Sequence, residues 1–231
     1  MKIISFTELT VMTVLVCGMM AACSSDDKEE GNGNDASKRI VRIEHNQNDN
    51  TYVRTFTYDN QNRIIKVVKV SNEPSYSEIN YEYGEKTITR TDDWGLTMSF
   101  SQKSTYTLSN GLIVKEVCNG ETRIFTYDNE GYLSTIDGKK VVWSNGNIIR
   151  IGDRQEYKYS NIPWKKMMIW VEDAIFYDIY LCQAGYWGKT PKDLPSEWVG
   201  RSPYKWEVSN GYVTKCTKGY YKDDNYTYYW E

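Results

Sequence analysis

The chain has 231 residues, a formal net charge of −3 and a sequence pI near 5.4. Its lysines and arginines are scattered and form no basic stripe of the kind that binds a phosphate backbone, which argues against nucleic acid as a partner. Tyrosine and tryptophan are abundant, with 20 and 8 residues against 5 phenylalanines, and this composition favours strands with half-exposed aromatic faces.

The first predicted element is an N-terminal leader. One lysine, Lys2, precedes an apolar run at 11–20 that is too short to cross a bilayer as a helix. The run ends in the sequence MAAC at 20–23, small residues followed by a cysteine. This motif resembles the lipobox of bacterial lipoproteins, in which the cysteine accepts diacylglycerol. We therefore expect a signal peptide at 1–22, acylation of Cys23 and attachment to the membrane through lipid alone.

Residues 23–37 follow as a polar, acidic stretch rich in glycine and asparagine. Such a stretch buries too little apolar area to offset its ordering entropy, so we expect a flexible tether. A Ser/Asp/Glu run directly after a lipidated cysteine also resembles the export signal of surface-exposed lipoproteins in gut Gram-negative anaerobes. This resemblance implies an outer-membrane protein at the cell surface. The alternative is a solubilising linker on a protein that faces the periplasm.

The remaining residues, 38–231, form one predicted domain with a repeated strand–turn–strand pattern. Its strongest copies are TFTYDNQNRII at 55–65 and IFTYDNEGYL at 124–133. Weaker copies with Asn-Gly turns lie at 105–113, 142–149 and 206–213. Asn-Gly supplies the positive φ angles of a tight hairpin, and the alternating residues place every second side chain on one face. The pattern predicts an all-β, antiparallel, up-and-down meander.

These copies resemble the tyrosine-aspartate (YD, Rhs-like) repeats of large bacterial surface and toxin-shell proteins. Together with the lipobox, the acidic tether and the sequences GYWGK at 185–189 and LPS at 194–196, they also resemble a smaller family of gut-anaerobe surface lipoproteins. That family is a domain of unknown function with a porin-like fold. The resemblance implies a curved or partly closed barrel-like sheet and no activity. Charged residues recur on both faces of the strands, as at 63–69, which argues against a barrel that spans the membrane.

One segment departs from the strand pattern. Between Pro163 and Cys182 the apolar residues are spaced by three or four, which predicts a helical insertion at 163–182. Asn161 would cap this helix and Gly185 would end it. Its second half is rich in β-branched and aromatic residues, so a strand is the alternative there. Residues 184–205 contain glycines, three prolines and several aromatics, which predicts a long ordered loop.

The sequence predicts no cofactor, no metal site and no catalytic residue. His45 is the only histidine and lies beside a polar stretch. We therefore expect His45 to be a solvated residue at the end of a strand rather than a metal ligand. Carboxylates are dense between 172 and 197, a density more typical of a solvated face than of a glycosidase pair. They are Glu172, Asp173, Asp178, Asp193 and Glu197.

The aromatic residues of the 184–205 loop are the candidate binding residues: Tyr186, Trp187, Trp198 and Tyr204. Exposed aromatic rings on a rigid scaffold can stack on sugars or anchor a protein partner. The alternative is that they plug an open end of the sheet and cover its core. The leading hypothesis is a non-enzymatic lipoprotein that binds a glycan or an envelope protein. A structural component of the envelope is the second hypothesis and a polysaccharide hydrolase the third; the pattern does not indicate an oligomeric state.

Three cysteines remain beyond Cys23. Cys118 and Cys216 each follow an Asn-Gly turn by an even number of residues, so they would face the same way on their strands. In an oxidising envelope they can form a disulfide, while buried free thiols are the alternative.

Overall fold

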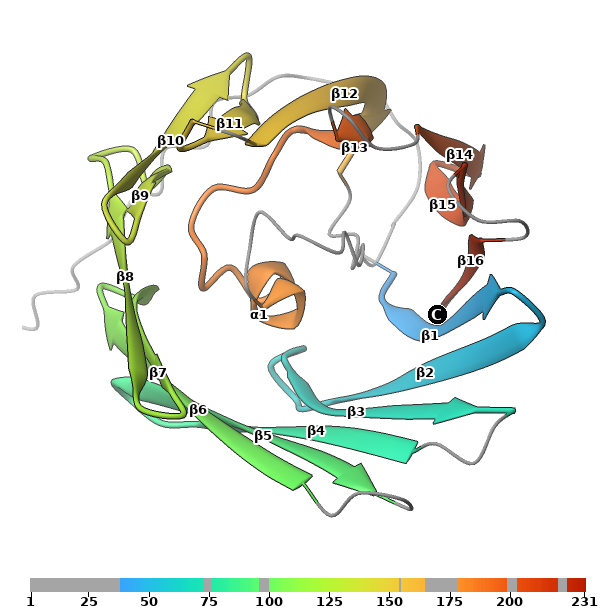
Figure 1. Cartoon of the computed structure of the whole chain (residues 1–231), viewed down its shortest axis with the longest axis horizontal. Helices are drawn as coiled ribbons and strands as arrows, with labels where there is room; N and C mark the ends of the chain where they lie inside the picture. The colour runs from blue at the N-terminus through green and yellow to red at the C-terminus, as the bar shows by residue number, and fades with distance from the viewer. Residues whose placement is uncertain are drawn as a thin grey trace, which may run out of the picture. The chain divides into compact units, whose positions relative to one another are not determined.

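The computed structural model describes residues 38–72, 76–95, 100–153, 155–164, 178–198, 203–219 and 224–231. These ranges form sixteen β-strands and one short helix, α1 (Ile179–Gln183), shown in Figure 1. In chain order the strands are β1 (Ile40–Gln47), β2 (Asn50–Tyr58), β3 (Ile64–Ser71), β4 (Tyr76–Tyr83), β5 (Thr87–Gly95), β6 (Phe100–Ser109), β7 (Leu112–Cys118), β8 (Glu121–Tyr127), β9 (Leu133–Ile136), β10 (Lys139–Ser144), β11 (Asn147–Ile151), β12 (Gln155–Pro163), β13 (Asp193–Trp198), β14 (Tyr204–Ser209), β15 (Tyr212–Lys218) and β16 (Asn225–Trp230). The predicted leader at 1–22 and the tether at 23–37, with Cys23, lie outside the described residues.

All sixteen strands belong to one antiparallel sheet, in which consecutive strands pair except β13 and β14, the two edges of the sheet. The pairing of β16 with β1 brings the two ends of the described domain together. The backbones of Arg39 and Glu231 exchange two hydrogen bonds there, of 2.9 and 3.0 Å. The sheet edges, β13 and β14, lie side by side, and the Trp206 indole N–H donates to the Pro195 carbonyl at 2.8 Å. The predicted meander is thus confirmed, and it curves into a nearly closed barrel.

The hairpins use the turn chemistry that the sequence indicates. Asn110-Gly111, Asn145-Gly146 and Asn210-Gly211 all have positive φ at both residues, as two-residue hairpin turns require. Both tyrosine-aspartate copies lie across hairpins, β2–β3 and β8–β9. In each, the aspartate carboxylate accepts two backbone N–H bonds, from Gln61 and Arg63 to Asp59, and from Glu130 and Tyr132 to Asp128.

An aromatic side chain at the end of a strand repeatedly donates a hydrogen bond to a backbone carbonyl of the adjacent strand. The donor and acceptor residues are Tyr58 to Ile40, Tyr83 to Ile64, Tyr127 to Ile113, Trp143 to Leu133, Tyr159 to Ile148 and Trp230 to Val213, all at 2.7–2.8 Å. These bonds lie at the barrel end that carries the tyrosine-aspartate turns, which we call the turn end. They give four of the tyrosines and two of the tryptophans a structural role, because each ring packs on the core while its polar tip bonds to backbone.

The predicted helix at 163–182 is wrong at its start. Pro163 is the last residue of β12, and residues 165–177 lie outside the described part of the chain. The helix begins after Asp178, whose carboxylate accepts from the backbone N–H groups of Tyr180 and Leu181. The predicted loop at 184–205 is also interrupted, because 193–198 form β13. Pro195 hides this strand from sequence patterns, and a proline is tolerated there because β13 is an edge strand.

Candidate functional site

The inward-facing rows of the strands change character along the barrel. Near the turn end the inward residues are apolar and buried, as with Phe56, Ile88 and Phe125. Two residues further along the same rows stand Arg54, Arg90 and Arg123. The interior therefore has an apolar half at the turn end and a polar half at the opposite end, which we call the cup end.

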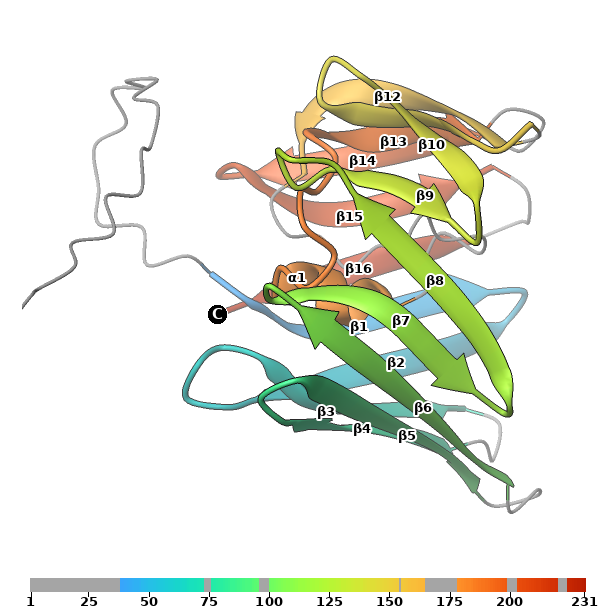
Figure 2. The ribbon, with the colours of Figure 1, turned by 90° about the vertical axis from the view of Figure 1, so that its left-hand side faces the viewer.

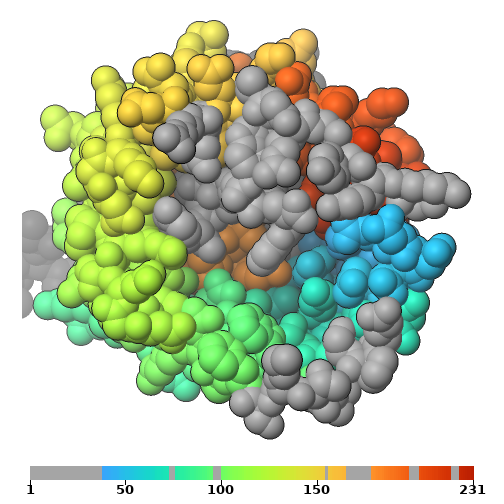
Figure 3. Space-filling model, viewed as in Figure 1, coloured from blue at the N-terminus to red at the C-terminus, as the bar shows by residue number. Residues whose placement is uncertain are grey.

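The apolar half is filled by α1 and the segment after it, coloured orange inside the ring of strands in Figures 1 and 3. Trp187 is only 1% exposed; it packs edge-on against Phe125 at 4.7 Å and its indole N–H donates to the Asp178 carbonyl. The backbone of this segment bonds to the turns around it, with Lys189 N–H donating to the Gly131 carbonyl. Gly188 lies so close to that carbonyl that a Cβ would sit 2.3 Å from it. This segment is a plug of the turn end.

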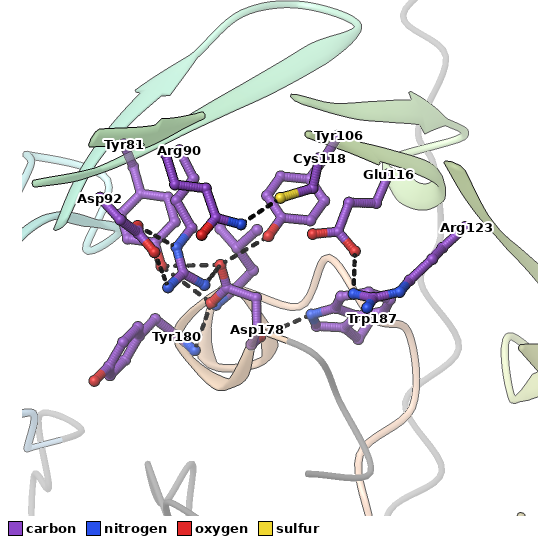
Figure 4. Close-up of polar contacts among 12 residues, drawn as sticks. Tyr81, Arg90, Asp92, Tyr106, Glu116, Cys118, Arg123, Asp178, Tyr180 and Trp187 are labelled. Atoms are coloured by element: carbon purple, nitrogen blue, oxygen red, sulfur yellow. Dashed lines mark hydrogen bonds and ion pairs between the residues drawn. The ribbon is translucent and has the colours of Figure 1, made fainter. Parts of the chain in front are cut away.

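The carboxylate of Asp178 joins the plug to the barrel wall (Figure 4). Its oxygens accept from the Tyr81 hydroxyl at 2.9 Å and the Tyr106 hydroxyl at 3.2 Å, and they pair with the Arg90 guanidinium at 3.1 Å. Burial, and then the Asp178 charge, raises the pKa of Tyr81 and Tyr106 well above the usual value, so both hydroxyls stay protonated and donate. A buried carboxylate is stable here because its hydrogen-bonding capacity is used fully.

Above this cluster lies a cavity of about 350 Å³ in the polar half, enclosed by the wall of β5, β6, β7 and β8 that Figure 2 shows from the side. Its lining is polar and includes Arg90, Asp92, Gln102, Ser104, Glu116 and Arg123. Arg90 forms two bonds to the Asp92 carboxylate, at 2.6 and 2.7 Å, and Arg123 pairs with Glu116 at 3.2 Å. Burial disfavours the charged guanidinium of Arg90, but Asp178 and its other neighbours outweigh burial and raise its pKa.

The cavity is open at the cup end. Asn119 and Glu121 at its mouth are exposed and the Arg123 side chain is 35% exposed, whereas the Glu116 and Asp92 side chains deeper in are only 6% and 10% exposed. Two arginines face three carboxylates, counting Glu121, so opposite charges nearly balance. Such a lining offers donors and acceptors in several directions, which suits a small, neutral, polar molecule better than a polyanion.

A second polar group lies on the opposite part of the inner wall. His45 of β1 bonds to Asp224 at 2.8 Å and stacks on the Tyr226 ring at 4.0 Å. His45 and Asp224 are buried, so the predicted solvated position of His45 is wrong. His45 faces the interior because it lies on the same inward row of β1 as Ile43. Within the described ranges, no group of three or more His, Cys, Asp or Glu side chains is placed to hold a metal ion.

The predicted binding residues do not form one exposed patch. Trp187 is buried in the plug, so its predicted place on a ligand-facing surface is wrong. It instead covers the core at one end of the sheet, which is the alternative that the sequence left open. Tyr186 is half-buried and stacks on Tyr83, and Tyr204 is half-buried and stacks on Trp206. The Trp198 backbone lies in β13, and its side chain lies outside the described part of the structure.

The predicted disulfide does not form, since Cys118, Cys182 and Cys216 are free thiols. Cys118 lies on β7 and Cys216 on β15, and the sheet order places β6 through β1 and then β16 between them. The two thiols do face the interior as expected, but from distant parts of the wall. Burial raises the pKa of Cys182 and Cys216. Cys118 is half-exposed and lines the cavity.

The cavity residues were missed because no sequence motif marks them. A weaker signal exists in the alternation of β5, β6 and β8: Arg90, Ser104 and Arg123 each stand two positions from a core residue. A charged side chain on the row of a buried aromatic or isoleucine indicates a polar interior, because exposed charges belong to the other row.

The fold and the cavity define a class: a nearly closed antiparallel barrel, plugged at one end and open to a polar cavity at the other. A crystal structure of a porin-like protein from Bacteroides uniformis is similar, with a TM-score of 0.55 at 17% identity over 84% of this chain and 96% of that one. The likeness is one of fold. No family model matches the chain, and no similar curated protein is found. Among the helices that the structure describes, none has the length and apolar character to cross a membrane.

Proposed function

We propose that the chain is a non-enzymatic ligand-binding protein of the cell envelope, held at the outer membrane by lipid on Cys23 and exposed at the cell surface. The cup end of the barrel would take up a small polar ligand such as the end of a glycan. The observation that carries this proposal is the open cavity of about 350 Å³ with a charge-balanced lining. This volume lies at the lower end of the range for ligand pockets, which run from about 300 to 1,000 Å³.

Both ends of the described domain, Lys38 and Glu231, lie at the turn end, whereas the cavity opens at the other end. A large protein partner, the second class of ligand expected from the sequence, fits a concave and charge-balanced site less well than a small polar group.

A pair of variants on one strand tests the proposal. Ser104 faces the cavity and is buried, whereas the next residue, Thr105, faces outward. Ser104→Trp should fill much of the cavity. The cavity of about 350 Å³ has room for the indole ring, because a protein cavity of about 150 Å³ is already large enough to hold benzene. Thr105→Trp adds the same side chain to the outer face and serves as the control.

Binding of mono- and disaccharides to the full chain in detergent is measured by calorimetry, with melting temperatures to verify folding. We expect at least one saccharide to bind both wild type and Thr105→Trp. The same saccharide should not bind Ser104→Trp, although this variant is folded. Equal binding to both variants would show that the ligand lies elsewhere.

A further inference from the structure

Two large aromatic side chains are exposed beside the cavity mouth. Trp94 near the end of β5 and Phe100 at the start of β6 are each 44% exposed, although both are large and apolar. They form a cross-strand pair, and their rings stack with centroids 5.2 Å apart and planes 19° from parallel. The stack is a flat apolar surface that the described part of the barrel leaves open to solvent.

The strand alternation places this stack on the inner wall. Trp94 shares a row with Asp92 and Phe100 shares a row with Gln102, and Asp92 and Gln102 are themselves a cross-strand pair. Asp92 and Gln102 line the cavity. The aromatic surface therefore continues the cavity wall by one residue pair, beyond its polar lining and toward solvent.

An aromatic surface joined to carboxylate, guanidinium and amide groups matches one chemical class of ligand. A pyranose ring has a face of C–H groups, which packs on an aromatic ring, and a rim of hydroxyls, which bind carboxylates and amides. We propose that Trp94 and Phe100 form a stacking platform for one ring of a neutral oligosaccharide whose terminal sugar lies in the cavity. This inference rests on the proposed function and names its ligand class.

The charges of the cavity lining favour a neutral sugar over an acidic one. Arg90 and Arg123 are already paired with Asp92 and Glu116, and Glu121 at the mouth adds a negative charge. An acidic or sulfated sugar would meet this carboxylate without a spare cation among the lining residues, which disfavours its binding.

The test uses hexasaccharides of glucan, mannan and xylan, with hexagalacturonate as an acidic probe. Binding to the full chain is compared among wild type, Trp94→Ala, Phe100→Ala and Tyr229→Ala. Tyr229 is also exposed but lies on the outward row of β16, so its variant removes an aromatic ring from the wrong face. Because Trp94 and Phe100 are half-exposed, their variants should keep melting temperatures near that of wild type.

We expect at least one neutral hexasaccharide to bind wild type and Tyr229→Ala equally and to bind each platform variant about tenfold more weakly. The matching monosaccharide, which reaches only the cavity, should bind all four proteins alike. If Ser104→Trp abolishes hexasaccharide binding while Trp94→Ala leaves it unchanged, the platform is wrong and the cavity proposal stands. Binding of the acidic probe alone, or of none of the four, would overturn the saccharide inference.

Discussion

At the residue scale, Asp178 shows how one side chain can serve several structural purposes. It caps α1, accepts hydrogen bonds from Tyr81 and Tyr106, and pairs with Arg90 at the floor of the cavity. The sequence indicated only a carboxylate in an acidic stretch. Its burial could not be predicted, because its partners come from β4, β5 and β6, about 70 to 100 residues earlier in the chain.

His45 gives a prediction at this scale that NMR can test without ambiguity, because it is the only histidine. Burial lowers its pKa below 6.5, and the nearby Arg54 and Lys218 charges add to this, against the opposing effect of Asp224. The unfolded chain then binds more protons than the folded one below pH 6.5. The stability that neutral His45 contributes should be complete above that pH and be lost as the pH falls toward its folded pKa.

We expect an NMR titration midpoint for His45 below 6.5. We also expect the free energy of unfolding to fall less steeply in His45→Gln than in wild type as the pH is lowered from 6.5. A midpoint above 6.5 would mean that the ion pair with Asp224 outweighs burial, and the account of this site would be wrong.

At the scale of elements, the hairpins and the presence of one helical insertion were predictable, but the residue at which the helix begins was not. A hairpin turn depends on a few adjacent residues, so Asn-Gly and Tyr-Asp sequences identify it directly. The stripe at 163–182 gave a false start for the helix because β12 continues through Pro163 by pairing with β13, whose residues lie far along the chain. Non-local pairing of this kind overrides a local pattern.

Asp128 tests the turn chemistry. Its carboxylate oxygen accepts from the Glu130 N–H at 3.0 Å and the Tyr132 N–H at 2.9 Å. Asp128→Ala removes both bonds and should lower the free energy of unfolding by about 1–2 kcal/mol. Asp128→Asn keeps an acceptor oxygen and should lose clearly less in the same denaturant titration. Equal losses for the two variants would show that charge, rather than the two hydrogen bonds, stabilises the turn.

At the scale of the whole domain, the alternation predicts a meander but does not say whether it closes. Closure depends on two contacts, the pairing of β1 with β16 and the approach of β13 to β14. The first of these joins residues almost 200 positions apart in the chain. The cavity follows from this curvature, because four strands must bend around one space before Arg90 and Arg123 face the same volume. Its position was therefore beyond the reach of sequence patterns.

Cys118 is placed to report whether a ligand enters the polar half of the barrel, as proposed above. Its thiol lines the cavity, whereas Cys182 and Cys216 are buried with raised pKa values and should react slowly with alkylating reagents. The measurement is the rate of Cys118 alkylation by N-ethylmaleimide, followed by peptide mass spectrometry, with and without a saturating saccharide that binds the chain. We expect the saccharide to slow alkylation of Cys118 about tenfold or more. An unchanged rate at saturation would mean that the saccharide does not bind in the cavity.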